Sequence, residues 1–315
     1  MKEELIISNI QFLYNSELGK NNWWRYLLTI MATWGVQIVL SIILGIIIAI
    51  VFIMQNGTSI TDLENIIYDP FVLLPLTLVG FAASFFVLYL CMRFIHHRKF
   101  ISFVTTKSKI NWFRILKGAG VWLFILGIVT IISFLIDPKG YQFTFNPNTF
   151  GILLIISLIT FPIQASFEEL FFRGYLMQAF GLLSKKPIIP LLSTSIIFGL
   201  VHVMNGSNMT ISGFPVIEAA IIGLMLGIIT LGEDSIETAT GIHIINNLYA
   251  ALIVSAQGSV LGDVPSVFTA PYDPYSSILW TIIFSVIAII VIFWGKKDKL
   301  LNIFRWKDTA NRDIY

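Results

Sequence analysis

The stretch Ser166-Phe167-Glu168-Glu169-Leu170-Phe171-Phe172-Arg173-Gly174 places three ionisable side chains inside an apolar segment that runs from about residue 149 to residue 180. A charge at the middle of a bilayer costs about 2.5 to 3.5 kcal/mol, whereas each flanking Leu, Ile or Phe returns about 0.3 to 0.6 kcal/mol. On a helix Glu169 and Arg173 are four residues apart and can form a structural ion pair. Glu168 points elsewhere. The pattern therefore predicts a polar cavity that receives the Glu168 carboxylate.

The composition is that of a membrane protein. Of 315 residues, 56% are hydrophobic and only 12% are charged, and the mean hydropathy is +0.83; about a quarter of the residues in a soluble domain are charged. A net charge of +2 gives no indication of nucleic acid. The expected partners are membrane lipids and a membrane-associated peptide or protein. The one cysteine, Cys91, allows no internal disulfide and no thiolate metal site.

Apolar runs predict an all-α polytopic protein with eight spans. They lie at about 26–54, 70–92, 118–136, 149–180, 188–204, 214–231, 236–256 and 276–295. No cleavable signal segment precedes the first span, so we expect it to remain as an anchor. We divide the chain into an N-terminal membrane region (1–148), a core of spans four to seven (149–256), and span eight with a basic tail (257–315).

Basic residues predict the orientation in the cell membrane. Of the 20 Lys and Arg residues, 18 lie at the N-terminus, in the second and fourth loops, or in the C-terminal tail, and the odd-numbered loops contain only Lys139. The positive-inside rule then places both termini in the cytoplasm. The basic second loop contains His96 and His97, which we expect to lie on a solvated, membrane-facing surface patch.

Two other histidines lie in separate apolar spans. A single intramembrane His is more often a hydrogen-bonding residue than a catalytic one, but here two of them accompany a carboxylate pair and Asn247. Glu168 can accept a proton from water and His202 can hold that water. His243 and Asn247, one helical turn apart, can donate hydrogen bonds to a developing oxyanion. This set contains what peptide hydrolysis needs.

A metal is the alternative way to activate water. Glu168, His202 and His243 supply three ligands and leave the open position that a catalytic zinc requires. The sequence has no His-Glu-x-x-His helix. The cofactor is therefore either zinc or none.

Helix geometry raises one difficulty. At about 1.5 Å per residue, Glu168 lies about 28 Å from the outer start of its span, but His202 lies about 21 Å from the inner start of its own. A kink at Pro162, tilt, or a polar link at 205–213 that dips inward can bring them together. We expect the site to open toward the cytoplasm, and Glu218 to reach the membrane interface by snorkelling.

Three motifs in order resemble the CPBP family of intramembrane proteases. They are Glu168-Glu169-x-x-x-Arg173, Phe198-x-x-x-His202 and His243-x-x-x-Asn247, with Gly174 after the Arg and Gly223-x-x-x-Gly227 in the intervening helix. The family includes type II CAAX prenyl endopeptidases and bacterial bacteriocin-processing or self-immunity proteins. The resemblance covers about residues 150 to 256.

The resemblance implies an endopeptidase, metal-dependent or not. The first Glu and first motif His would activate water, and the second His with its Asn would form the oxyanion site; these roles correspond to Glu168, His202, His243 and Asn247. Two other classes stay open. A non-enzymatic immunity or scaffold protein would need only the fold. A proton-coupled transporter would show paired repeats with broken helices, and the sequence has no such pairing.

Overall fold

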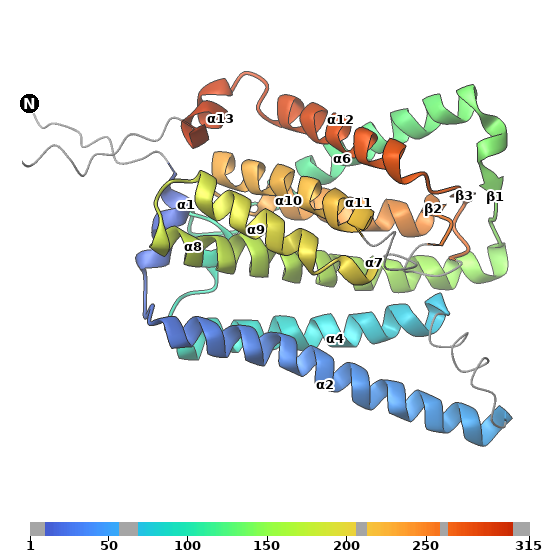
Figure 1. Ribbon diagram of the computed structural model, residues 1–315, viewed down its shortest axis with the longest axis horizontal. Coiled ribbons are helices and arrows are strands. Elements are labelled where there is room, and N and C mark those ends of the chain that lie inside the picture. The colour runs from blue at the N-terminus through green and yellow to red at the C-terminus, as the bar shows by residue number, and fades with distance from the viewer. Residues whose placement is uncertain (1–9, 57–68, 206–212, 259–263, 305–315) are drawn as a thin grey trace, which may run out of the picture.

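The computed structural model describes residues 10–56, 69–205, 213–258 and 264–304. Six helical segments in it are long and apolar enough to cross a membrane: Trp23–Gln55, Pro70–Ile95, Trp112–Ile136, Pro147–Leu183, Gly213–Glu233 and Pro274–Ile292. They run along the long axis of the molecule (Figure 1). The chain is therefore mostly helical and has the build of a polytopic membrane protein. The other two expected spans correspond to shorter helices of 13 and 16 residues, so the count of eight stays a prediction.

The elements follow the apolar runs closely. The α-helices are α1 (Gln11–Tyr14), α2 (Trp23–Asn56), α4 (Pro70–Leu90), α5 (Ile101–Val104), α6 (Trp112–Ile136), α7 (Pro147–Glu169), α8 (Met177–Leu183), α9 (Ile188–Leu200), α10 (Gly213–Glu233), α11 (Glu237–Leu252), α12 (Pro274–Ile292) and α13 (Lys297–Phe304). Three of them begin with an Asx cap followed by proline, because the side chains of Asp69, Asn146 and Asp273 accept backbone N–H groups of the first turn.

Shorter helical turns lie between these helices. The 3₁₀ turns are η1 (Asn15–Glu17), η3 (Pro138–Gly140) and η5 (Val203–Asn205), and the π-helical turns are η2 (Cys91–Ile95) and η4 (Leu170–Leu176). The turn η4 joins α7 to α8, so the Glu-Glu span forms one continuous helical segment of 37 residues.

The helices form three layers, one of them central. The hairpin of α2 and α4 packs on α7 from one side. The centre consists of α7, α9, α10 and α11, and α6 and α12 cover α11 and α10 from the other side (Figure 1). The expected core of spans four to seven is thus the central layer, and the N-terminal helices α2 and α4 pack directly against it.

A small sheet at one end of the bundle was not predicted. Its strands β1 (Gln142–Phe143), β3 (Phe268–Ala270) and β2 (Val254–Ala256) lie in that order, β1 antiparallel and β2 parallel to β3. Span seven was expected to continue to residue 256, but α11 ends at Leu252 and the chain then enters β2. We call this end of the molecule the sheet end; α1 and α13 lie at the opposite end (Figure 1).

The second loop is not the solvated patch that its charges suggested. His96 is fully buried, and Arg98 is 3% exposed. The His96 ring lies 2.8 Å from the Tyr175 hydroxyl, and Arg98 donates to Gln178 at 2.6 Å. Burial lowers the pKa of His96 to about 4, so its imidazole is neutral. Of the two histidines, His97 alone is exposed. The loop folds back because η4 and α8 present polar side chains to it.

Helices α6 and α11 cross unusually closely. A Cβ on Gly118 would lie 2.2 Å from the Thr238 carbonyl oxygen, and one on Gly241 would lie 1.9 Å from the Ile115 carbonyl oxygen. Glycine at these two positions therefore sets the distance between the helices.

Replacing Gly118 by Ala should separate these two helices. We expect Gly118→Ala to destabilise the protein by about 1 to 3 kcal/mol through overpacking, measured as a lower thermal midpoint in detergent. Gly120→Ala is the matched control, because no atom lies within 4 Å of its added Cβ on the same helix. It should be neutral or slightly stabilising. Equal midpoints for the two variants would contradict this account of the crossing.

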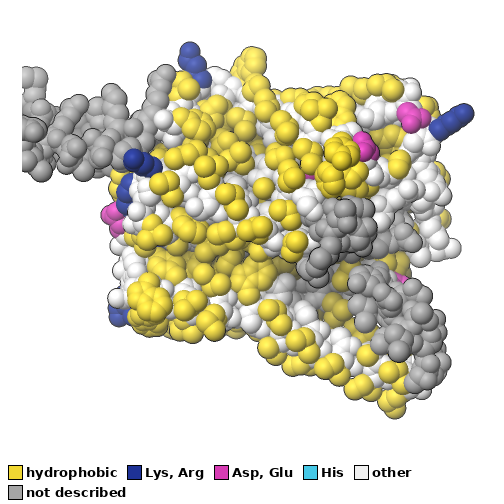
Figure 2. Space-filling model, in the orientation of Figure 1, with side chains coloured by type: hydrophobic (Ala, Val, Ile, Leu, Met, Phe, Trp, Pro, Cys, Tyr) yellow, Lys and Arg dark blue, Asp and Glu magenta, His cyan; other side chains and the backbone are white. Residues whose placement is uncertain are grey.

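Side-chain charges lie at the two ends of the molecule, while hydrophobic side chains cover the visible face between them (Figure 2).

Single cysteines in a Cys91→Ser background test the predicted orientation. Cysteines at Gln55 and Gln257, both exposed, should react with an impermeant reagent added to intact cells. Those at Lys107 and Lys299, also exposed, should react only after the cells are opened. Labelling at Lys299 in sealed cells would rule out cytoplasmic termini.

Candidate active site

The predicted Glu169–Arg173 pair is confirmed. Arg173 Nη1 lies 2.7 Å from Glu169 Oε1, and the two side chains are 1% and 0% exposed. Arg173 also donates to the Gly223 carbonyl at 3.3 Å, and its guanidinium carbon lies 4.3 Å from the centre of the Phe198 ring. Arg173 belongs to η4, a π-helical turn of the kind often found at functional sites. A carboxylate, a carbonyl and an aromatic face thus surround the buried cation.

His243 lies between the two adjacent glutamates. Its Nδ1 is 2.7 Å from Glu169 Oε1, the oxygen that also pairs with Arg173. Its Nε2 is 3.6 Å from Glu168 Oε2. A bond from Nδ1–H to Glu169 fixes the ring and turns Nε2 toward Glu168. Sequence reasoning placed His243 beside Asn247 and missed its partner, which lies on another helix.

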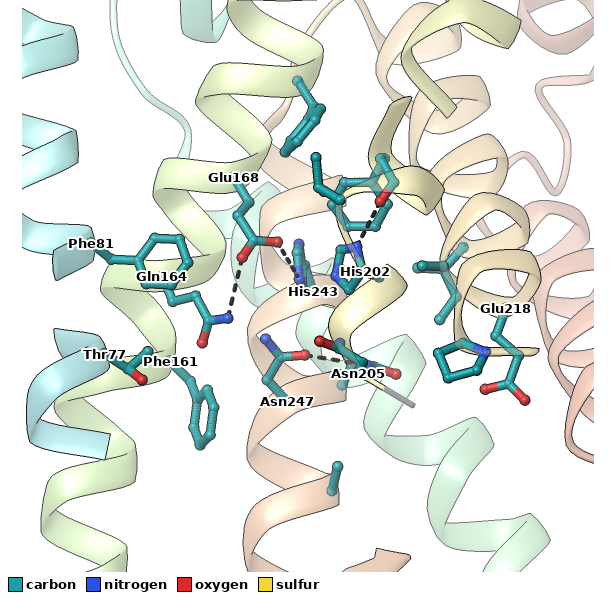
Figure 3. A pocket seen from close by; sticks show the side chains of 18 of the residues that line it. Thr77, Phe81, Phe161, Gln164, Glu168, His202, Asn205, Glu218, His243 and Asn247 are labelled. Atoms are coloured by element: carbon teal, nitrogen blue, oxygen red, sulfur yellow. Dashed lines mark hydrogen bonds and ion pairs between the residues drawn. The ribbon is translucent and has the colours of Figure 1, made fainter. Parts of the chain in front are cut away.

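Glu168 is nearly buried but has one oxygen without a hydrogen bond. The residue is 6% exposed, and Gln164 donates to Oε1 at 3.2 Å. Its Oε2 has no hydrogen-bond partner within the described chain. Figure 3 shows the carboxyl group directed into the pocket, toward His243. This oxygen is itself buried, so it is a polar atom that lacks a hydrogen-bond partner in the described structure.

All four predicted catalytic residues line one cavity of about 500 Å³, a volume typical of ligand sites. His202 Nδ1 is 2.6 Å from the Phe198 carbonyl oxygen, which leaves Nε2 as its second polar atom. The Asn247 side-chain oxygen accepts a hydrogen bond from Asn246 at 3.3 Å, so its amide hydrogens can serve as donors. The structure therefore brings Glu168, His202, His243 and Asn247 together.

The sequence predicted different depths for Glu168 and His202 because the residues were counted from opposite sides of the membrane. The segment Pro147–Leu183 has 37 residues and continues past the membrane core, so both sites can be measured from the end where α8 meets α9. Glu168 lies about 22 Å from Leu183, and His202 lies about 21 Å from Ile188, at about 1.5 Å per residue. The two residues are therefore level without a special kink.

The direction of the cavity differs from the expectation. Most of its wall on α4, α10 and α11 comes from the half of each helix nearer the sheet end, including Thr77, Pro215 and Ala250. On the other side the large side chains of Phe172 and Phe198 are buried. The cavity thus extends toward the sheet end, away from α1 and α13, rather than toward the side where the termini were placed.

Several lining residues were missed or misassigned. Gln164 and Asn246 are new, and their signal was their spacing, one turn before Glu168 and next to Asn247. Gln37 of α2 lines the cavity from outside the expected core. Glu218, for which we expected snorkelling to the interface, lines the cavity and accepts a hydrogen bond from Tyr272 at 2.8 Å.

The zinc alternative stays a prediction. Within the described residues, no group of three or more His, Cys, Asp or Glu side chains is placed to hold a metal ion. The set Glu168, His202 and His243 is therefore not a ready ligand set, and no step below uses a metal. Measuring the zinc content of the purified protein tests this alternative.

The cavity in this bundle of long apolar helices contains a carboxylate, two imidazoles and an amide, which are groups that hydrolysis can use. Residues 149–249 match the family model described as type II CAAX prenyl endopeptidase Rce1-like. The chain is 34% identical over 289 residues to the uncharacterized protein YyaK of Bacillus subtilis (strain 168), covering 89% of this chain and 95% of that protein. No solved structure matches it. The chain belongs to the Rce1-like type II CAAX prenyl endopeptidase (CPBP) family.

Replacement by Gln should change the stability of the protein at Glu169 but not at the adjacent Glu168. Glu169→Gln removes the charge that balances Arg173 and holds His243, so we expect a loss of about 3 to 5 kcal/mol in stability, as for other broken buried pairs. Thermal unfolding in detergent measures it. Glu168→Gln is the matched control, since its amide oxygen still accepts from Gln164, and its midpoint should stay near that of the parent. A stable Glu169→Gln protein would refute the structural role.

Proposed function

We propose that the protein is an intramembrane endopeptidase that hydrolyses a peptide bond in a membrane-associated peptide or a lipidated protein tail. The observation that carries the proposal is that Glu168 lines the cavity and that its Oε2, which lies 3.6 Å from His243 Nε2, has no hydrogen bond within the described residues. Family membership supports a protease as well. The proposed reaction needs no group that the chain does not supply, other than water.

In the first step water attacks the peptide carbonyl carbon. Glu168 takes a proton from the water as its oxygen bonds to the carbon, and His202 Nε2 holds the same water by accepting its second hydrogen. The carbonyl oxygen becomes an oxyanion. Asn247 donates an amide N–H to it, and His243, held at Nδ1 by Glu169, donates from Nε2.

In the second step the tetrahedral intermediate collapses. The carbon–nitrogen bond breaks, the oxyanion returns to a carbonyl, and the proton held by Glu168 passes to the leaving amine. The products are a carboxylic acid and an amine, and Glu168 is again ionised. Glu169 and Arg173 take no part in bond making; they keep His243 in place, so they are positioning residues.

Substitution in the cavity separates this mechanism from its alternatives. Glu168→Gln cannot accept the proton, so cleavage should vanish while the protein folds normally. Asn247→Ala removes one oxyanion donor and should slow turnover by about 10²- to 10³-fold. The assay is the cleavage rate of a membrane peptide that accumulates in a strain lacking the protein.

Glu17→Gln, at the end of the molecule opposite the cavity, is the control for handling and yield. Near-normal cleavage by Glu168→Gln would refute the catalytic role. Unchanged biological activity of this variant would favour a scaffold or immunity protein instead.

A further inference from the structure

The cavity contains a second carboxylate that the proposed reaction does not use. Glu218 lies on α10, one wall of the cavity, and Figure 3 shows it apart from Glu168 and His243. The Tyr272 hydroxyl donates to it at 2.8 Å, and the Ser277 hydroxyl also bonds it. Burial and the neighbouring Glu218 raise the pKa of Tyr272, so the phenol stays protonated and remains a donor.

No cation of the chain neutralises this carboxylate in the described structure. None of the residues that line the cavity is Lys or Arg. The ion pairs formed by Lys, Arg and His involve Glu17, Glu168, Glu169, Glu233 and Glu237, and Glu218 is not among them. A carboxylate in a partly buried site favours a positive partner, because the interaction is less screened there than in bulk water. A cationic group of a bound molecule would therefore be attracted to Glu218 in this cavity.

Acidic residues in the connections at the sheet end add to the negative electrostatic potential that Glu218 produces. The described parts of the connections from α2 to α4, α6 to α7, α9 to α10 and α11 to α12 contain the acidic residues Asp69, Asp137 and Asp273 and a single basic one, Lys139. Such a distribution attracts cationic molecules to the end toward which the cavity extends and repels anionic ones.

Together these observations favour a substrate that carries a positive charge. We infer that Glu218, held by Tyr272, binds a Lys or Arg side chain of the peptide that enters the cavity, and so selects cationic peptide segments. This rests on the proposed function, since it takes a peptide as the occupant. A peptide whose C-terminal carboxylate lies inside the cavity is disfavoured by the same charges.

Binding can be measured apart from cleavage. The probes are fluorescent synthetic hydrophobic peptides in detergent micelles, amidated at the C-terminus and identical except for Lys, Gln or Glu at one position that is moved along the peptide. With inactive Glu168→Gln protein, the Lys peptide at its best position should bind about tenfold more tightly than the Gln peptide, and the Glu peptide more weakly still. The difference should shrink as salt is raised.

Variants at Glu218 assign the preference to this residue. Adding Glu218→Gln, which keeps an acceptor for Tyr272, should abolish the Lys preference, and Glu218→Lys should reverse it toward the Glu peptide. Glu17→Gln removes the same charge far from the cavity, where Glu17 pairs with Lys185, and should leave the preference intact. With protein that retains Glu168, the Lys preference should appear in KM rather than in kcat.

The outcomes distinguish the two proposals. A Lys preference that depends on Glu218, without cleavage by the protein that retains Glu168, would support this inference and refute the endopeptidase. Cleavage without any charge preference would support the endopeptidase and refute the role of Glu218. Equal binding of the three peptides, binding of none of them, or a Lys preference that survives Glu218→Gln would overturn the role of Glu218.

Discussion

The buried ion pair between Glu169 and Arg173 is the constraint on which the site depends. Its two charges are almost completely removed from solvent, where an unpaired charge would be far more costly than one at the surface. Each partner therefore makes further contacts with neighbouring elements, although Glu169 Oε2 has no hydrogen bond in the described structure. Arg173 contacts α10 through the Gly223 carbonyl and α9 through the Phe198 ring, while Glu169 contacts α11 through His243. One interaction thus fixes four elements relative to one another.

This arrangement explains why the two adjacent glutamates have separate roles. One oxygen of Glu169, Oε1, contacts both a guanidinium and an imidazole, so this carboxylate holds two neighbouring side chains. Each of the two glutamates has a second oxygen, Oε2, without a hydrogen bond in the described structure. What separates them is position: Glu168, about one hundred degrees round the helix, lines the cavity, and Glu169 is not among the lining residues. In the proposed reaction this places a positioning residue and a reacting residue within one turn.

Local patterns in the sequence predicted part of this. The spacing of Glu169 and Arg173 and the apolar runs predicted the ion pair and the long helices, because these depend on residues near in sequence. The contact from His243 to Glu169 joins residues 74 positions apart, and no periodicity signals it. The burial of His96 and Arg98 was missed for the same reason: the charges suggested solvent, but partners on α8 and η4 supply the hydrogen bonds. The short strands carry too few residues to produce an alternating pattern.

Helix α9 has a further consequence through its length. Its 13 residues rise about 20 Å, against a hydrocarbon core of about 30 Å. From Val201 to Asn205 the backbone continues as a turn and a 3₁₀ helix, so its carbonyl and amide groups must find partners at a depth where lipid offers none. Just beyond the end of this half-length helix, Val201, His202 and Asn205 line the cavity. For the proposed hydrolysis, the truncation of α9 would leave room beside His202 for water, the second reactant, which a bilayer core otherwise excludes.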